Sequence, residues 1–149
     1  MFDDLNDLYQ QVILDHSKKP RNYGRMEHPT CDACGKNPLC GDQIQVFAVM
    51  DGDKIREVKF EGDGCAIFKA SASMMTDSLK GKTQAESHVL FDEFHELITK
   101  GTAPEGNHLG KLEVFGGVNR FPARVKCALL SWRAAMAAVG TGEKTVSTE

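Results

Sequence analysis

The chain has 149 residues, of which 41% are hydrophobic and 26% are charged, so it has the size of one domain with a single core. Its formal net charge of -3 and pI near 6.0 give no broad basic field, which argues against nucleic acid as a main partner. No apolar run approaches the ~20 residues that cross a bilayer, so we expect no membrane partner and a cytoplasmic location.

The first half of the chain predicts one helix, one loop and two strands. Apolar residues at spacings of three and four predict a helix over residues 3–17. Residues 26–41 have no clear period and contain several chain breakers, which predicts a surface loop. Two β-rich runs follow, and the Asp-Gly-Asp sequence between them favours a hairpin with strands at about 43–50 and 54–61.

The middle of the chain predicts helices. A run of small and apolar residues is typical of a buried helix that packs closely on a sheet, with Cys65 in its first turn. A further helix is expected after Thr83, a plausible N-cap. The glycine-rich residues 101–119 predict a structured loop or a short extended segment rather than another long helix.

The end of the chain predicts a last helix and a tail. The helix follows Pro122 and carries Cys127 near its start. Trp132 on this helix is expected to pack in the protein with its N–H hydrogen-bonded at the edge. We expect one domain over residues 1–140 and a flexible C-terminal tail over residues 141–149.

The five cysteines indicate metal binding or reactivity. A reducing compartment and an odd number both argue against structural disulfides. Cys40, Cys65 and Cys127 fall at the expected ends of elements, and a helix N-terminus favours the thiolate that binds metal and attacks sulfur. They lie too far apart in sequence for a local knuckle. Small buried hydrophobes are therefore an alternative for Cys65 and Cys127.

Three segments together resemble a known family. They are "NPLCGD" at 37–42, "FEGDGCAIFKASASMM" at 60–75 and "FPARVKCALLSW" at 121–132. In this order, and with "DHSKKPRN" at 15–22, they resemble the SufU branch of the IscU/NifU N-terminal family over about residues 8–138. The resemblance implies an α+β fold, with a small antiparallel β-sheet, helices packed mainly on one face, and thiols that converge at one exposed end.

The resemblance also implies a metal site. In SufU-like proteins the residues matching Cys40, Asp42, Cys65 and Cys127 bind one zinc ion. Gly41 would let the backbone turn so that the Cys40 thiolate and the Asp42 carboxylate face the same ion. Three sulfurs and one oxygen form a donor set that tetrahedral zinc accepts. The single hard oxygen ligand suits a site whose ligands exchange.

The function implied is sulfur transfer. Proteins of this branch accept persulfide sulfur from a pyridoxal-phosphate cysteine desulfurase and pass it to iron-sulfur cluster assembly components, with Cys40 as the expected acceptor. The alternative is a scaffold on which an iron-sulfur cluster is assembled and transferred. Lys126 stands where such scaffolds carry a histidine, and an ammonium is a poor ligand, so zinc is favoured. A third alternative is a zinc-stabilised module that only activates a desulfurase.

Two further features have open interpretations. Cys31 and Cys34 form "CDAC", which is typical of a second metal site, a partner in exchange with the main site, or a redox pair. They are equally consistent with two loop thiols that have no function. Arg124 and Lys126 would either meet acidic groups on a desulfurase or balance charge beside the thiolates.

Overall fold

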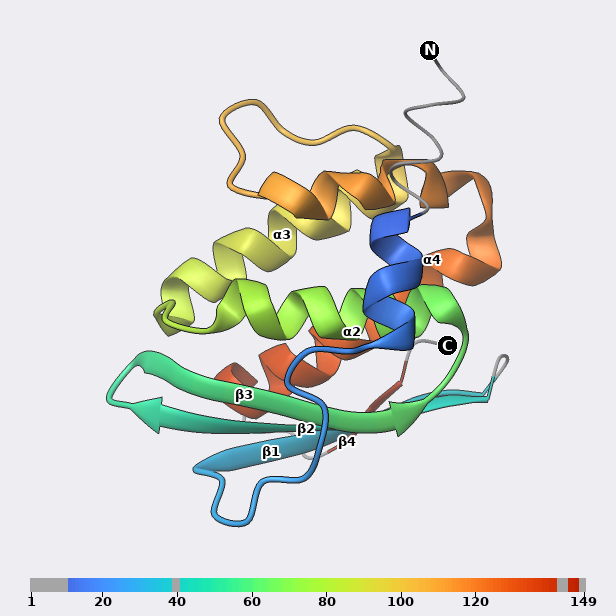
Figure 1. Ribbon diagram of the computed structural model, residues 1–149. Helices are drawn as coiled ribbons and strands as arrows, with labels where there is room; N and C mark the ends of the chain where they lie inside the picture. Colours follow the sequence, from blue (N-terminus) through green and yellow to red (C-terminus); the bar gives the residue numbers. More distant parts are fainter. Residues whose placement is uncertain (1–10, 39–40, 142–144, 148–149) are drawn as a thin grey trace.

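A computed structural model describes residues 11–38, 41–141 and 145–147 as a sheet covered on one face by helices (Figure 1). The sheet has the strand order β3-β2-β1-β4. Its strands are β1 (Cys31–Asn37), β2 (Asp42–Asp51), β3 (Lys54–Asp63) and β4 (Thr145–Ser147). The pairs β1–β2 and β2–β3 are antiparallel, whereas β4 lies parallel to β1. The predicted α+β class is therefore confirmed, with a mixed rather than purely antiparallel sheet.

The helices form the second layer of the molecule (Figure 1). After a first helix at residues 11–18 come α2 (Ala66–Leu79), α3 (Gln84–Lys100), the 3-10 helix η1 (Gly110–Arg120), α4 (Pro122–Met136) and the π-helix η2 (Ala137–Thr141). The expected cap at Thr83 is confirmed, because its side chain and that of Glu86 form a reciprocal capping box. Among the residues that the structure describes, no helix is long and apolar enough to span a membrane.

The β2–β3 hairpin agrees with its prediction to within two residues at each end. Gly52 in the connecting turn has a φ of 63°, the conformation that glycine adopts at least cost. Ile44, Val46 and Ala48 alternate along β2 on the buried face. This period of two is typical of a strand with one buried face.

Strand β1 lies within residues 26–41, so the prediction of a loop is wrong for Cys31–Asn37. Its core-facing positions hold residues too small or too polar to reveal a strand by apolar alternation: Cys31, Ala33, Gly35 and Asn37. These residues are small because helix α4 packs closely on β1: a Cβ at Gly35 would lie 3.0 Å from Leu130 Cδ1 and 3.4 Å from Ala134 Cβ. The close approach of helix and strand selects small residues here.

The glycine-rich segment also differs from its prediction. Residues 110–120 form the 3-10 helix η1, where a loop or extended segment was expected. Eleven residues is long for a 3-10 helix. Leu112, Phe115 and Val118 are buried along it, so apolar packing at a spacing of three holds this helix despite its glycines.

Trp132 on α4 is completely buried and stacks on Phe94 with ring centroids 4.7 Å apart. Its packing is therefore as expected. The indole Nε1 has no hydrogen-bond partner within the described part of the chain, so the prediction of a bonded N–H is wrong. Stacking and burial of a large aromatic surface outweigh that missing bond.

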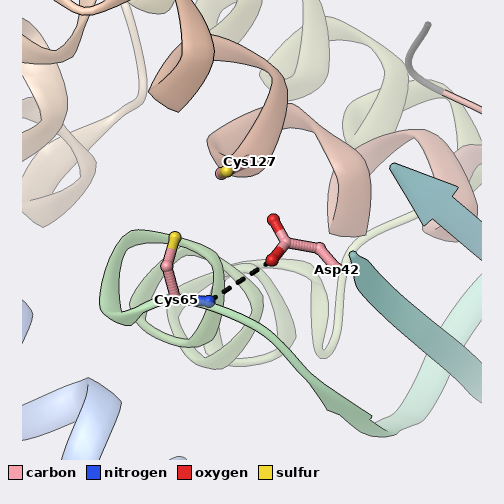
Figure 2. A group of neighbouring side chains, drawn as sticks. All are labelled: Asp42, Cys65 and Cys127. Atoms are coloured by element: carbon pink, nitrogen blue, oxygen red, sulfur yellow. Dashed lines mark hydrogen bonds between the residues drawn. The ribbon is translucent and has the colours of Figure 1, made fainter. Parts of the chain in front are cut away.

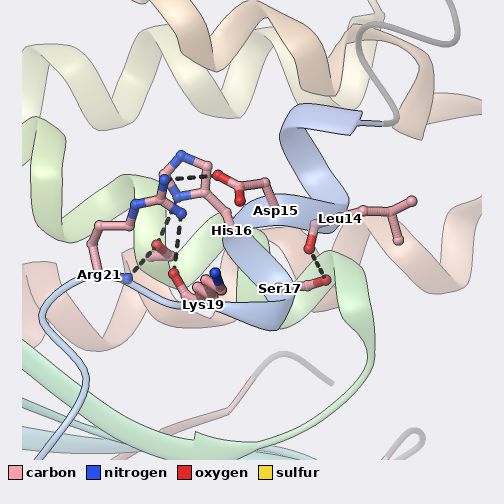
Figure 3. Close-up of polar contacts among 7 residues, drawn as sticks. Leu14, Asp15, His16, Ser17, Lys19 and Arg21 are labelled. Carbon is pink, nitrogen blue, oxygen red and sulfur yellow. Dashed lines mark hydrogen bonds and ion pairs between the residues drawn. The ribbon is translucent and has the colours of Figure 1, made fainter.

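The segment at residues 15–22 attaches the first helix to α2. Ser73 Oγ on α2 accepts a hydrogen bond from the Arg21 backbone N–H at 2.8 Å and lies 2.7 Å from His16 Nδ1. Arg21 also forms an ion pair with Asp15 at 2.7 Å, drawn in Figure 3. This ion pair lowers the pKa of Asp15. We name these contacts, together with those of Asn22, the α2 anchor.

Candidate metal centre

Three residues from distant parts of the sequence meet at one end of the molecule. Ligand atoms of Asp42, Cys65 and Cys127 all lie within 4.8 Å of one another. Asp42 begins β2, Cys65 precedes α2 and Cys127 lies on α4, so packing of α2 and α4 against the sheet creates the cluster. Figure 2 shows the Asp42 carboxylate directed between the two sulfurs. These are three of the four residues that the sequence analysis expects as metal ligands.

The burial and hydrogen bonding of the Asp42 carboxylate indicate whether the cluster fits a cation. The residue is only 3% exposed. Its Oδ1 accepts a hydrogen bond from the Cys65 backbone N–H at 3.3 Å, but Oδ2 is buried and has no hydrogen-bond partner in the described residues. An unpartnered buried carboxylate oxygen is costly. One oxygen and two sulfurs around such a point are donors that zinc accepts, so the residues fit the ion.

Cys65 is the N-cap of α2, which confirms its predicted place at the helix start. Its extended backbone directs the sulfur back over the helix terminus, where it accepts a hydrogen bond from the Phe68 backbone N–H at 3.5 Å. The preceding Gly64 has no room for a side chain, because a Cβ there would lie 2.6 Å from Asp42 Oδ1. Glycine at this position allows the carboxylate to reach Cys65.

Cys127 is deeper in its helix than the sequence suggests. It is the sixth residue of α4, whose first residue is Pro122. The unpaired N–H groups of a helix belong to its first four residues, so α4 offers Cys127 little of the effect expected at a helix start. Its side chain is completely buried. Asn37 Nδ2 points a hydrogen bond at its sulfur over 4.0 Å.

Arg124 lies one helical turn before Cys127 and is exposed. The charges of Cys65 and Cys127 and hydrogen bonds to both sulfurs raise the pKa of Arg124 above its usual value. Of the two interpretations of this arginine, the contacts therefore support charge balance beside the sulfurs. Lys126 is half-buried and adjacent to Cys127 in sequence.

The fourth predicted ligand, Cys40, lies outside the described residues. Its neighbour Gly41 has a φ of 74°, so glycine is required for the turn that precedes β2. The Gly41 N–H donates to the Asn37 carbonyl oxygen at 2.8 Å and closes the connection between β1 and β2. In the sequence Cys40 stands between Asn37, the last residue of β1, and Asp42, the first residue of β2.

Cys31 and Cys34 do not form a pair. Both lie on β1 rather than in a loop, and three residues apart on a strand means opposite faces and about 10 Å between Cα atoms. A disulfide requires Cα atoms closer than about 7 Å. Cys31 packs against the core, whereas Cys34 lines a hollow on the other face of the sheet. While β1 is intact they cannot share a metal ion or a disulfide.

The sequence alone does not identify Asn37 or Gly64 as parts of the site, although both lie inside the motifs at residues 37–42 and 60–75. Asn37 is completely buried and opposite Asp42 in the β1–β2 register. A polar residue on the core face of a strand is the signal that would identify it, but that signal appears only once β1 is known to be a strand.

Comparisons with known proteins agree with this geometry. The family described as NifU-like N terminal domain matches residues 8–128. The zinc-dependent sulfurtransferase SufU of Bacillus subtilis is 43% identical over 130 residues, covering 87% of this chain and 88% of that protein. The iron-sulfur cluster assembly scaffold protein IscU of Streptococcus pyogenes serotype M1 is 41% identical over 135 residues, covering 91% and 84%.

A solved structure gives the same result for the fold. The crystal structure of FiSufU, described as a candidate iron-sulfur cluster assembly scaffold protein for the SUF system of Fervidobacterium islandicum AW-1, superposes with a TM-score of 0.81 at 37% identity. The match covers 87% of this chain and 94% of that one. With its sequence, fold and clustered residues in agreement, the chain belongs to the NifU-like N-terminal domain family.

Proposed function

We propose that this protein is a zinc-dependent sulfur acceptor that takes persulfide sulfur from a cysteine desulfurase for iron-sulfur cluster assembly. The observation that carries the proposal is the cluster of Asp42, Cys65 and Cys127 with its unpartnered buried carboxylate oxygen. The similarity to a relative named a zinc-dependent sulfurtransferase supports it.

The residues that would hold zinc are Cys40, Asp42, Cys65 and Cys127. Bound zinc keeps its thiol ligands deprotonated at neutral pH. The chain supplies the orientation: the Cys65 N–H fixes one carboxylate oxygen of Asp42, which leaves the other facing the sulfurs. Arg124 adds a fixed positive charge at the exposed side of the same cluster.

The transfer step belongs to Cys40 in this proposal. Its thiolate attacks the outer sulfur of the desulfurase persulfide and forms a new sulfur–sulfur bond. The bond between the two persulfide sulfurs breaks, and the desulfurase cysteine leaves as a thiolate, so no external oxidant or reductant is consumed. The buried Cys127 is poorly placed for this role, because a macromolecular persulfide needs access to its acceptor.

A second function is a scaffold for an iron-sulfur cluster. The observation that favours it is the 41% identity to a relative named as such a scaffold, together with thiolates that also ligate iron. Lys126 argues for the first function, since it stands beside Cys127 where scaffold proteins carry a histidine ligand. The two functions differ in the metal that the chain carries.

Metal analysis of protein purified without oxygen, followed by single-turnover transfer from a cysteine desulfurase, tests the proposal. We expect one zinc per chain and a persulfide on the chain detectable by mass spectrometry. Cys40→Ala should abolish that persulfide. Cys34→Ala is the matched control, because Cys34 is a half-buried thiol on the far face of the sheet and should leave transfer unchanged.

Three outcomes would overturn the proposal. Full persulfide formation by Cys40→Ala would assign the acceptor elsewhere. Iron with labile sulfide in place of zinc would establish the scaffold function instead. Stimulation of the desulfurase without any persulfide on this chain would identify a module that only activates its partner.

A further inference from the structure

We propose that Asn37 is a positioning residue that holds Cys127 as the anchored ligand of the site, the thiolate that stays in place while another accepts sulfur. The inference deepens the proposed function and rests on its metal site. It assigns unequal roles to the three thiolates, which a simple list of ligands does not.

The contact between Asn37 and Cys127 is isolated from water. Asn37 Nδ2 and Cys127 Sγ are 4.0 Å apart, and both residues are 0% exposed. The distance is long, but within the described residues Cys127 is the partner recorded for this N–H group. Because water does not reach either group, the amide donates to this sulfur or leaves its donor unused.

An N–H group directed at a thiolate changes its chemistry. Hydrogen bonds to ionised acceptors are stronger than those between neutral groups, and here the bond stabilises charge on sulfur. The sulfur becomes a weaker nucleophile and its direction is fixed. Outer residues that hold a ligand in this way typically contribute 10–100-fold to metal affinity.

The backbone of Asn37 links this anchor to the predicted acceptor. Asn37 ends β1, and its carbonyl oxygen accepts the Gly41 N–H that closes the connection to β2. One residue thus fixes a buried sulfur with its side chain and bounds the Cys40 segment with its main chain.

Cys65 differs from Cys127 in its exposure to solvent and in the origin of the hydrogen bond that its sulfur accepts. It is half-buried, and its sulfur accepts a backbone N–H that belongs to its own helix. Arg124 forms hydrogen bonds to both sulfurs, so it does not distinguish them. Apart from Arg124, Cys65 is held by its own helix α2, whereas Cys127 receives a side chain from β1. A substitution at Asn37 should change the properties of Cys127 and leave those of Cys65 nearly unaltered.

Cobalt-substituted protein tests the inference through its sulfur-to-cobalt charge-transfer band. Asn37→Ala removes the amide, and Asn37→Leu removes it while keeping the number and branching of the side-chain heavy atoms. Without the N–H group, charge on sulfur is less stabilised, so the band should shift to lower energy in both variants. Chelator competition should show zinc affinity about 10–100-fold weaker.

The matched control is Asn107→Ala. Asn107 is a half-buried amide in a loop, where it donates to Pro104 and accepts from Leu109, and it should leave the band and the affinity unchanged. A second measurement needs no variant: alkylation of the zinc-loaded wild-type chain, mapped by mass spectrometry, should modify Cys127 after Cys40 and Cys65.

The outcomes separate the two proposals. Early alkylation of Cys127 in metal-loaded wild type would overturn the role of Asn37 and leave the zinc site intact. An unchanged band and an unchanged zinc affinity in the Asn37 variants would do the same. A wild-type chain that binds neither zinc nor cobalt would overturn the proposed function, and the anchor with it.

Discussion

Helix α2 takes part in two polar clusters that differ in how they are satisfied. In the α2 anchor, Ser73 and Thr76 bond the segment before β1: Ser73 contacts His16 and the Arg21 N–H, and Thr76 accepts from Asn22 at 3.0 Å. At the other cluster, around the N-cap of α2, a carboxylate oxygen and an amide oxygen are buried without partners in the described residues. Both clusters bury polar atoms, but these atoms are hydrogen-bonded in the α2 anchor and partly unpartnered at the other cluster.

The difference distinguishes structure from function. A fully bonded buried cluster stabilises the fold and needs nothing further. A cluster with unpartnered groups lowers stability unless a ligand completes it. Ser131 and Trp132 also carry unpartnered buried atoms, but these are neutral groups in the helical layer, whereas Asp42 belongs to the cluster with two thiols.

Asp42→Asn should give the largest effect and opposite signs in two measurements. Loss of a ligand should weaken zinc binding by more than the 10–100-fold typical of an outer residue. The metal-free protein should instead become more stable by about 1–3 kcal/mol, because a buried unpartnered charged oxygen is removed. Chelator competition and urea unfolding measure the two quantities.

The matched control for this change is Asp15→Asn in the α2 anchor. Asp15 is exposed and paired with Arg21, so its replacement should leave zinc affinity unchanged. If metal-free Asp42→Asn were less stable than wild type, the carboxylate would be satisfied by the protein itself, and the contrast between the clusters would fail.

Ser73→Ala should give the reverse pattern with a smaller effect. It leaves the buried His16 ring and the Arg21 N–H without their partner, so the free energy of unfolding should fall by about 1–3 kcal/mol. Zinc affinity should not change. Ser78→Ala, which removes a hydroxyl bonded to its own helix at Met74, is the control and should cost less. Weakened zinc binding in Ser73→Ala would mean that the two clusters are coupled.

The sequence predicts most of the fold where physical patterns are strong. The β2–β3 hairpin shows alternation and a turn glycine, and α3 shows a cap and an apolar face. Strand β1 lacks such a pattern because α4 packs so closely that Gly35 and its neighbours must be small. Helix η1 is not predicted because its glycines indicate a break while Leu112, Phe115 and Val118 still bury an apolar side.

The sequence likewise predicts some residues of the site and not others. Family resemblance, rather than spacing, identifies Asp42, Cys65 and Cys127 as neighbours, since only tertiary packing joins them. The same motifs contain Asn37 without indicating its role, because its contact with Cys127 depends on β1 lying beneath α4. Motifs therefore predict ligands more readily than they predict the residues that hold them.

The α2 anchor should also respond to pH, through His16. Burial lowers the pKa of this ring, as do Arg21 and, to a smaller degree, Lys111; Asp77 and Asp15 oppose the shift. A histidine with a lowered pKa in the folded state favours its neutral form. The stabilisation is therefore complete above the ordinary value of 6.5, where folded and unfolded chains are both neutral.

Below pH 6.5 the unfolded chain takes up a proton that the folded chain resists, so the free energy of unfolding should fall until His16 titrates in the folded state as well. Burial of the ring is the main cause of this resistance, since it disfavours the charged form, and the positive charge of Arg21 adds to it. Urea unfolding of metal-free wild type and His16→Gln across this range isolates the effect, because glutamine does not titrate. An equal loss of stability in both proteins would assign the pH dependence to groups outside the anchor.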